Sequence, residues 1–364
     1  MTPAAALLDR IVPLVRTRLP AGVDAAYLDD FLDRNRPALV AVIEANLAPL
    51  LRRIASANPV PTEDLPELWS AAQRTAANVA AMTVAAALAA QRRAATAEER
   101  RVLTGYSGWG GLSIRSATGR FPPSFPVPEE RGLIHEFYTP TRVAREIARV
   151  IGPLLPPGEV HALEPSAGIG RMIRAFEGLP RVSWNAVEWS DLSSRMLAAL
   201  RPDLDLFVGP FERWVRERGP AWQGRLQLVV SNPPYGIRGA SIAEDPDRAY
   251  REKMAYHYFL RRGLDLLAPD GIGVFLVPGG FLTSRTAGFT ALREKVLRRH
   301  HLAAAFRLPS MRPNGREAIF PGAMLVTDLL FFRARGGELS EVDAADRGIL
   351  TGHYFTEFPG HILG

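Results

Sequence analysis

Two acidic residues at the ends of short apolar runs are candidate ligands for a small molecule. In Ala162–Gly170, Glu164 ends such a run, and a turn of small residues then opens a helix at about Arg171–Glu177. Glycine lets a backbone approach a ligand closely, and the first amides of a helix can meet a carboxylate or a phosphate. The next run ends in Glu188, 24 residues after Glu164, where a carboxylate can accept hydrogen bonds from both hydroxyls of a ribose. Because the turn lacks the third glycine of a dinucleotide-binding loop, the pattern predicts a cofactor with a single nucleoside.

A third chemical motif, Ser231-Asn232-Pro233-Pro234-Tyr235, follows the fourth apolar run. It resembles the catalytic loop of the amino-group methyltransferases that use S-adenosylmethionine (AdoMet). The resemblance implies that the Asn232 side-chain oxygen and the Pro233 carbonyl accept both hydrogens of a target amine. That contact draws the nitrogen toward sp³ geometry and stabilises the charge that develops during methyl transfer. Pro234 belongs to the same catalytic loop, and Tyr235 would supply an aromatic face for a base swung out of the helix.

Further positions match this family in the same order. Phe137-Tyr138-Thr139-Pro140 resembles the segment that contacts the methionine part of the cofactor, and Phe211 the residue beside its adenine. Phe281 resembles the second aromatic that binds the target base. The cofactor motifs precede Asn-Pro-Pro-Tyr in the sequence, which is the order found in gamma-type adenine-N6 methyltransferases. The resemblance therefore implies a site-specific DNA methyltransferase that flips adenine. The implied AdoMet site comprises Tyr138, Thr139, Pro140, Glu164, Pro165, Ser166, Ala167, Gly168, Gly170, Glu188, Phe211 and Asn232.

A narrower likeness extends the match to both sides of these motifs. Gly105–Leu112, Ala305–Pro309 and Thr327–Phe332 occur in the same order in the methyltransferase region of large phage-, plasmid- and defence-associated proteins, often joined to a helicase. The last residues, from His353 to Gly364, resemble a segment that leads into further sequence there. We therefore expect a portion or a trimmed relative of such a protein, with helicase or other defence-system subunits as partners.

Two positions depart from the family pattern. Pro210 precedes Phe211 where many relatives carry an aspartate that binds the cofactor adenine, and Gln227 stands where the fourth strand often carries an aspartate. These departures predict either weak cofactor affinity or an adenine amine held by backbone groups. Glu212 is a candidate substitute at a different register.

The elements that position these motifs alternate between short strands and amphipathic helices from about 133 to 335. This alternation predicts a doubly wound α/β sheet, which the resemblance makes a Rossmann-like methyltransferase sheet. The last two strands have no long helix between them, so we expect an antiparallel hairpin at the sheet edge. The expected strands are His161–Glu164, Ser183–Glu188, Asp205–Val208, Gln227–Ser231, Gly273–Val277, Leu302–Arg307 and Met324–Arg333.

The first hundred residues are predicted to be helical. Apolar residues from Leu7 to Leu19 recur at three- and four-residue steps, and a long alanine-rich helix is expected at about Glu67–Arg93. The predicted division is an N-terminal helical domain at 1–100, a Gly/Pro-rich connector at 101–132, the methyltransferase domain at 133–335, and a C-terminal tail or link to further sequence at 336–364.

Composition excludes several other chemistries. The chain has no cysteine, its seven histidines lack metal-ligand spacing, and no phosphate-binding loop of a nucleoside triphosphatase occurs. Asp9 and Arg10 interrupt the first apolar stretch, unlike in a signal peptide, and no apolar run is long enough to span a bilayer. We therefore expect a cytoplasmic protein without a metal or a membrane partner. The net charge of +6 is compatible with nucleic-acid binding but does not demonstrate it.

Two other classes of function share these motifs. The same loop methylates glutamine amides in translation factors and amines in structured RNA, and a degenerate methyltransferase fold can serve only as a weakly active DNA- or partner-binding module. The N-terminal helices and Gly105–Leu112 favour the DNA-associated group over the glutamine enzymes. The intact loop at 232–235 favours catalysis over a scaffold.

Overall fold

The computed structural model describes residues 66–114, 136–179, 181–310 and 325–363, with single positions at 34, 36, 37, 120, 319–321 and 323. The helix predicted from the apolar residues between Leu7 and Leu19 lies outside the described residues. So does the proline-rich part of the predicted connector. In the described part of the chain, no helix is long and apolar enough to cross a membrane.

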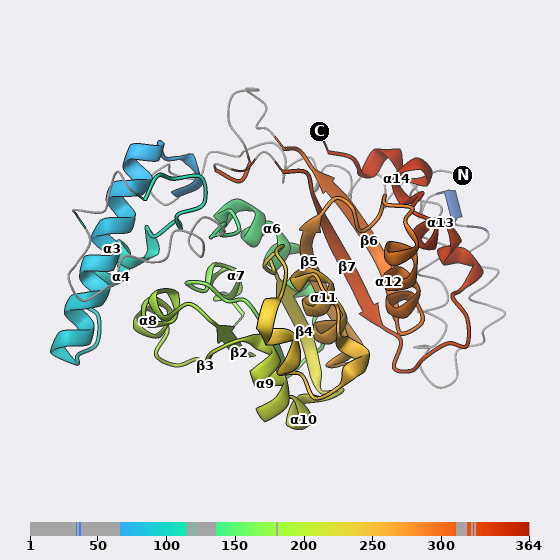
Figure 1. Ribbon diagram of the computed structural model, residues 1–364, viewed down its shortest axis with the longest axis horizontal. Coiled ribbons are helices and arrows are strands. Elements are labelled where there is room, and N and C mark those ends of the chain that lie inside the picture. The colour runs from blue at the N-terminus through green and yellow to red at the C-terminus, as the bar shows by residue number, and fades with distance from the viewer. Residues whose placement is uncertain are drawn as a thin grey trace.

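A seven-stranded sheet, in the order β3-β2-β1-β4-β5-β7-β6, forms the framework (Figure 1). Strands β1 to β5 pair in parallel, and β7 is antiparallel to both β5 and β6. The predictions of a doubly wound sheet and of an antiparallel edge are therefore confirmed. The strands are β1 (Val160–Glu164), β2 (Val182–Glu188), β3 (Asp205–Val208), β4 (Leu226–Ser231), β5 (Leu267–Pro278), β6 (His300–Leu308) and β7 (Thr327–Ala334).

The connections create a crevice at the carboxyl ends of β1 and β4. The chain moves outward from β1 through β2 to β3 and then returns to place β4 on the other side of β1. Open α/β sheets bind ligands at such a reversal of strand order. The register pairs Leu163 with Val229, so the segments that follow Glu164 and Ser231 leave the sheet side by side. The topology thus brings two of the predicted motifs together.

Helices cover both faces of the sheet, and neighbouring residues of β5 contribute to opposite cores. Val274 and Leu276 pack in a core with α6 and α7, whereas Phe275 and Val277 pack in a core with α9, α11 and α12. Burial on both faces explains why β4 contains the uninterrupted apolar run 228–230. The helices are α6 (Thr141–Ile151), α7 (Arg171–Ala175), α8 (Asp191–Leu200), α9 (Phe211–Glu217), α10 (Gly219–Trp222), α11 (Ala255–Asp265) and α12 (Ala287–Leu297).

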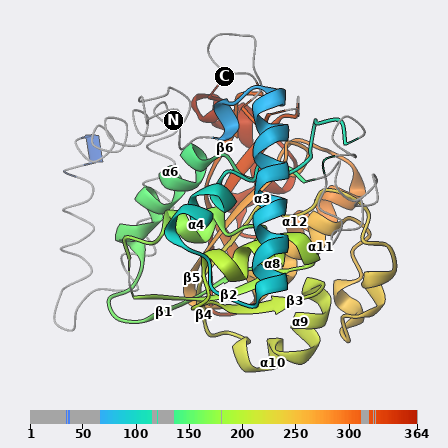
Figure 2. The same cartoon turned by 90° about the vertical axis from the view of Figure 1, so that its left-hand side faces the viewer.

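The described N-terminal helices, α3 (Ala71–Gln91) and α4 (Ala97–Thr104), pack against the β3 end of the sheet. Each begins with a capping box, from Ser70 in α3 and from Thr96 in α4. Figure 2 shows α3 lying across α4 and α8, and the three helices share one core. The loop at 105–112, expected to begin a connector, is part of that core, because Trp109 is fully buried. The division into four segments stays a prediction.

The C-terminal residues fold back along the edge strand β6, where a tail or a link was expected. Helices α13 (Arg347–Leu350) and α14 (Tyr354–Glu357) lie beside β6 (Figure 1). The Ala305 amide donates to the Tyr354 hydroxyl at 2.8 Å, and the Leu363 amide donates to the Arg307 carbonyl at 3.0 Å. A strand at a sheet edge exposes unpaired backbone groups, and this segment satisfies two of them.

Replacing Tyr354 by Phe removes the acceptor of the buried Ala305 amide and the hydrogen bond between the hydroxyl and His361 Nδ1 at 2.9 Å, while keeping the ring that packs in the core. We expect the free energy of unfolding to fall by about 1–3 kcal/mol, the usual cost of a buried donor left unsatisfied. Denaturant titration of Tyr354→Phe beside Thr356→Ala, an exposed site on α14, measures it. Equal midpoints for the two variants would show that the hydroxyl contributes nothing to this edge.

Candidate active site

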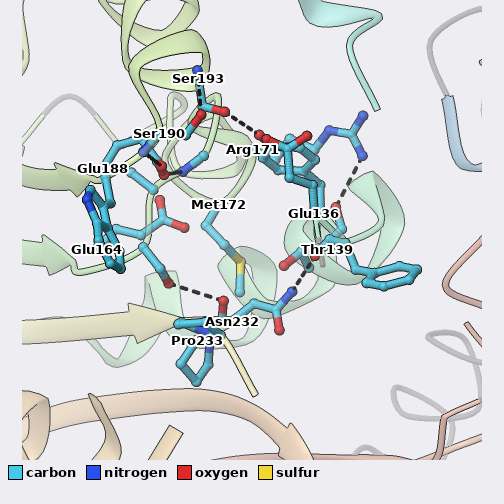
Figure 3. A pocket seen from close by; sticks show the side chains of 17 residues that line it. Glu136, Thr139, Glu164, Arg171, Met172, Glu188, Ser190, Ser193, Asn232 and Pro233 are labelled. Carbon is cyan, nitrogen blue, oxygen red and sulfur yellow. Dashed lines mark hydrogen bonds between the residues drawn. The ribbon is translucent and has the colours of Figure 1, made fainter. Parts of the chain in front are cut away.

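A cavity of about 680 Å³ lies at the carboxyl ends of β1, β2 and β4 (Figure 3). Its lining contains most of the predicted cofactor and catalytic residues, which are Tyr138, Thr139, Glu164, Ser166, Ala167, Gly168, Glu188, Asn232, Pro233 and Pro234. Pro165 and Phe211 instead line a smaller adjoining cavity of about 120 Å³. Pro140 precedes α6 and Gly170 precedes α7 as their N-terminal caps. The structure therefore gathers segments that lie up to about 100 residues apart in the sequence.

Glu188 at the end of β2 is held by backbone amides. Its Oε2 accepts from the Gly168 amide and its Oε1 from the Ser190 amide, both at 2.6 Å. Burial raises the pKa of the Glu188 carboxyl, and these backbone hydrogen bonds act in the opposite direction. A carboxylate has about four lone-pair sites, so each oxygen can accept a further hydrogen bond. Glu188 therefore retains the capacity to bind a ribose diol.

Two further carboxyls, Glu164 and Glu136, face the same cavity. Burial and the charge of Glu188 hold the pKa of Glu164 well above its usual range. Among the described residues, Glu164 Oε2 is buried and has no hydrogen-bond partner. Burial raises the pKa of Glu136 to about 7, although its Oε2 accepts from the Tyr106 hydroxyl at 2.8 Å.

No cationic side chain in the described part of the chain forms an ion pair with any of these three carboxyls. Arg171, which also lines the cavity, donates instead to the Tyr106 and Thr139 carbonyls. Buried carboxyls without a cation favour a ligand that brings its own positive charge. AdoMet fits these three carboxyls, because its sulfonium and ammonium groups carry positive charge and its ribose diol can donate hydrogen bonds.

The turn after β1 needs glycine because Tyr138 lies against it. Gly168 has φ +57°, and a Cβ there would lie 2.1 Å from Tyr138 Cε1. The Tyr138 hydroxyl is hydrogen-bonded to Ser193 Oγ at 2.7 Å, which fixes the ring over the turn. The glycine predicted to admit a ligand therefore also admits the aromatic ring that closes one side of the cavity.

Two hydrogen bonds orient the Asn232 side chain, and a third holds its backbone. Its Nδ2 donates to the Phe137 carbonyl at 3.1 Å, and its Oδ1 accepts from the Tyr235 hydroxyl at 3.0 Å. Ser166 Oγ donates to the Asn232 carbonyl at 3.1 Å. Because a carbonyl only accepts, the amide nitrogen must face Phe137, and Oδ1 keeps one lone pair for another donor.

The two aromatic residues predicted to bind a target base differ in their accessibility. Tyr235 is half-buried, with its ring edge-on to Tyr256 at 6.2 Å between centroids. Phe281 is fully buried and packs on Phe332, and it does not line either cavity. Its role at a target base stays a prediction.

The departures from the family pattern have structural explanations. Glu212 is buried, and its Oε1 accepts from Arg238 Nε at 2.8 Å and from Ser241 Oγ at 3.0 Å. The charge of this carboxylate is therefore already compensated by an ion pair with Arg238. Gln227 lies at the start of β4, away from the crevice, where its Oε1 accepts from the His161 amide at 2.8 Å. Pro210 lines the smaller cavity, which leaves an adenine there without an aspartate partner at that position.

Several residues of this site were not marked by the sequence, among them Glu136 and Trp189. Trp189 directly follows Glu188, lines both cavities and is 67% exposed. A tryptophan next to a predicted ribose ligand was a usable signal for a stacking surface. Glu136 precedes the Phe-Tyr-Thr-Pro segment, and nothing in the sequence marks it as buried. No group of three side chains suited to a metal ion occurs among the described residues.

Comparisons with known proteins match part of this chain to a family model. Residues 186–310 match the model of the Eco57I restriction-modification methylases. The chain is 26% identical over 249 residues to the Defense against restriction protein B of Escherichia phage P1, which covers 68% of this chain and 10% of that protein. The chain thus spans about a tenth of the length of this curated relative, in agreement with the narrower likeness to large phage proteins.

Two solved structures resemble this fold at lower sequence identity. A protein assigned as the modification subunit of a type I restriction enzyme from Vibrio vulnificus YJ016 is 18% identical, with a TM-score of 0.47 over 92% of this chain and 82% of that chain. A protein assigned as a class I AdoMet-dependent methyltransferase from Listeria monocytogenes is 15% identical, with a TM-score of 0.48 over 81% of this chain and 91% of that chain.

The family-model match includes the end of β2, the Asn-Pro-Pro-Tyr loop and most of the strands that follow. The resemblance predicted from the motifs is therefore confirmed: residues 186–310 of this chain are similar to the restriction-modification methylases.

Proposed function

We propose that this chain transfers a methyl group from AdoMet to the N6 amine of adenine in DNA, as part of a bacterial defence or mobile-element system. The observation that carries the proposal is the Asn232 amide, whose nitrogen is held by Phe137 while its oxygen remains available beside the cavity. Partners in this proposal are DNA and further subunits of the same system, helicases included. The Asn-Pro-Pro-Tyr loop also serves RNA and protein-glutamine methylation, which remain the alternatives.

In this proposal the cofactor supplies the electrophilic methyl group. Glu188 binds the ribose diol, and Glu164 and Glu136 compensate the positive charge. Trp189 and Phe211, which line the smaller cavity, would hold the adenine ring of AdoMet. Tyr138 and Thr139 line the region of the methionine part.

The catalytic loop acts on the target amine. The Asn232 Oδ1 and the Pro233 carbonyl accept the two amine hydrogens, which localises the lone pair on nitrogen and stabilises the developing charge. The Tyr235 hydroxyl already donates to Asn232 Oδ1, so it holds that oxygen in place, while its ring offers a face to the extruded base. No general base is required before the methyl transfer.

Replacing Asn232 by Ala removes the side-chain acceptor and leaves the cofactor cavity otherwise intact. We expect the methylation rate to fall on the order of 10²–10³-fold, as for other preorganised transition-state contacts, with AdoMet affinity nearly unchanged. Radiolabelled AdoMet offered with duplex DNA, RNA and cell protein measures the rate and the substrate class together. Gln223→Ala, at an exposed amide near the opposite end of β4, is the control.

Full activity in Asn232→Ala would place the chemistry elsewhere. Label transfer by the unmodified protein to RNA or protein but not to DNA would reject the DNA proposal and select one of the alternatives.

Replacing Glu188 by Gln removes the negative charge and one of the two acceptor oxygens. We expect AdoMet affinity to fall by at least about tenfold, which corresponds to roughly 1.4 kcal/mol, since hydrogen bonds to charged groups contribute about 1.5–3 kcal/mol each. Calorimetric titration with AdoMet measures this loss. Asp191→Asn, an exposed carboxylate in the first turn of α8, should bind like the unmodified protein, and equal affinities in both variants would refute the ribose assignment.

The pKa of Glu136, which burial raises to about 7, predicts a pH dependence of cofactor binding. Below this pH the carboxyl is neutral, and above it the ionised form attracts a cationic ligand. Affinity for AdoMet should therefore rise between pH 6 and pH 8, by up to about tenfold for a single coupled group.

Glu136→Gln should bind AdoMet with a flatter pH profile, while Glu159→Gln, at an exposed carboxyl before β1, should keep the slope. Calorimetry across this range tests both variants. A slope unchanged in Glu136→Gln would assign the titration to another group.

A further inference from the structure

The glycine-rich loop Gly105–Leu112 is placed beneath the site and not within it. None of its residues lines the large cavity, and Tyr106 and Trp109 have no exposed surface. Its polar groups face in two directions, toward α3 on one side and toward the segment 136–139 on the other. The loop therefore connects an N-terminal helix with the wall of the cofactor site.

On the α3 side, two buried polar side chains bind the loop backbone. Asn78, fully buried, donates from Nδ2 to the Gly108 carbonyl at 2.7 Å and accepts on Oδ1 from the Ser107 amide at 2.7 Å. Arg74, 4% exposed, donates from Nη2 to the Gly110 carbonyl at 3.0 Å and from Nε to Ser107 Oγ at 3.2 Å.

These two polar residues interrupt the apolar pattern of α3. The second half of its buried face carries Ala81, Met82, Ala85 and Leu88, which pack without polar contacts. Helix packing alone does not need a buried amide or guanidinium, because each adds a desolvation cost that only specific hydrogen bonds offset. The first half of α3 is therefore suited to fixing the loop conformation.

On the side facing the cofactor site, the loop holds the segment at 136–137. The Gly110 amide donates to the Glu136 carbonyl at 3.1 Å, and the Tyr106 hydroxyl donates to the Glu136 carboxyl. A Cβ on Gly108 would lie 2.5 Å from the Glu136 carbonyl oxygen, and one on Gly110 would lie 2.7 Å from Phe137 Cδ1. The glycines thus permit a backbone contact that holds residues 136 and 137.

The Phe137 carbonyl is the acceptor for Asn232 Nδ2. We propose that Asn78, with Arg74, is a positioning residue for methyl transfer: through the loop Gly105–Leu112 and the Phe137 carbonyl, it sets the orientation of the Asn232 amide. This inference rests on the proposed catalytic role of Asn232. In this inference, helix α3 contributes to the rate of methyl transfer as well as to the packing of the fold.

The test compares Asn78→Ala with Thr83→Ala. Thr83 is an exposed residue on the same helix, and its hydroxyl donates to the Val79 carbonyl of that helix. Asn78→Ala should lower kcat about 10- to 100-fold, as expected when a catalytic group is slightly misplaced. The Kd of AdoMet and the KM for DNA should change by less than about threefold. Thr83→Ala should match the unmodified protein in all three quantities.

A spectroscopic measurement reports on Asn232 without requiring activity. The chain contains seven asparagines, so labelling with [¹⁵N]asparagine gives few side-chain amide signals, and the pair lost in Asn232→Ala identifies Asn232. This pair should shift in Asn78→Ala and stay in place in Thr83→Ala. If Asn78→Ala does not fold, Ser107→Ala, which removes only the hydroxyl contacted by Asn78 and Arg74, should give the same shift with a kcat loss of about threefold or more.

Unchanged kcat and an unchanged Asn232 signal in a folded Asn78→Ala or Ser107→Ala protein would overturn the inference. Loss of AdoMet affinity with an unchanged Asn232 signal would also overturn it, since that result describes general damage to the cavity wall. If the unmodified protein does not methylate DNA while the Asn232 signal responds to Asn78→Ala, the proposed function fails and the structural coupling stands.

Discussion

The site depends on one hydrogen bond, from the Asn232 side-chain nitrogen to the Phe137 carbonyl. It joins residues 95 positions apart and connects the loop after β4 to the segment before α6. An amide has a donor end and an acceptor end, and a peptide carbonyl can satisfy only the donor. The direction in which the acceptor oxygen points is therefore set by a backbone group, which a side-chain substitution at position 137 would not remove.

Each partner of this bond is fixed by a different part of the fold. Asn232 leaves the sheet beside Ser166, because β1 and β4 are neighbours and end at the same level. Phe137 is fixed by the loop before it, which reaches into the core shared by α3, α4 and α8. The central sheet alone would fix only the Asn232 end of this hydrogen bond, and the loop packed on the N-terminal helices fixes the Phe137 end.

The sequence predicted the parts of this structure that depend on local pattern. Strands β1, β2 and β4 were predicted because strands buried on both faces are apolar and end in turn residues. A short apolar run also marked β3, although its residues are exposed or half-buried, and the edge hairpin was predicted from the lack of a long helix between its strands. The ends of those strands also marked Glu164, Glu188 and Asn232. The start of β5 was missed, since Pro269-Asp270-Gly271 is typical of a turn and Asp270 does have φ +65°.

Contacts between distant segments were beyond the reach of local pattern. Phe281 follows β5 at a position where an aromatic could face either the crevice or the core, and packing against Phe332 on β7 decides it. The loop at 105–112 has the glycine content of a ligand-binding loop, yet its neighbours are Asn78 and Glu136, which are about 30 residues away on either side. The family resemblance indicated that these segments matter, and only the structure shows what they touch.

The three carboxyls at the cavity, of which Glu164 is buried, have a consequence for the stability of the protein. Removing acidic groups from water without an ion-pair partner lowers the stability of the fold, and a cationic ligand that binds only the native state recovers it. Natural proteins commonly lose some stability where a site must stay ready for its ligand. The stability of this chain would then rise with the concentration of its small-molecule ligand.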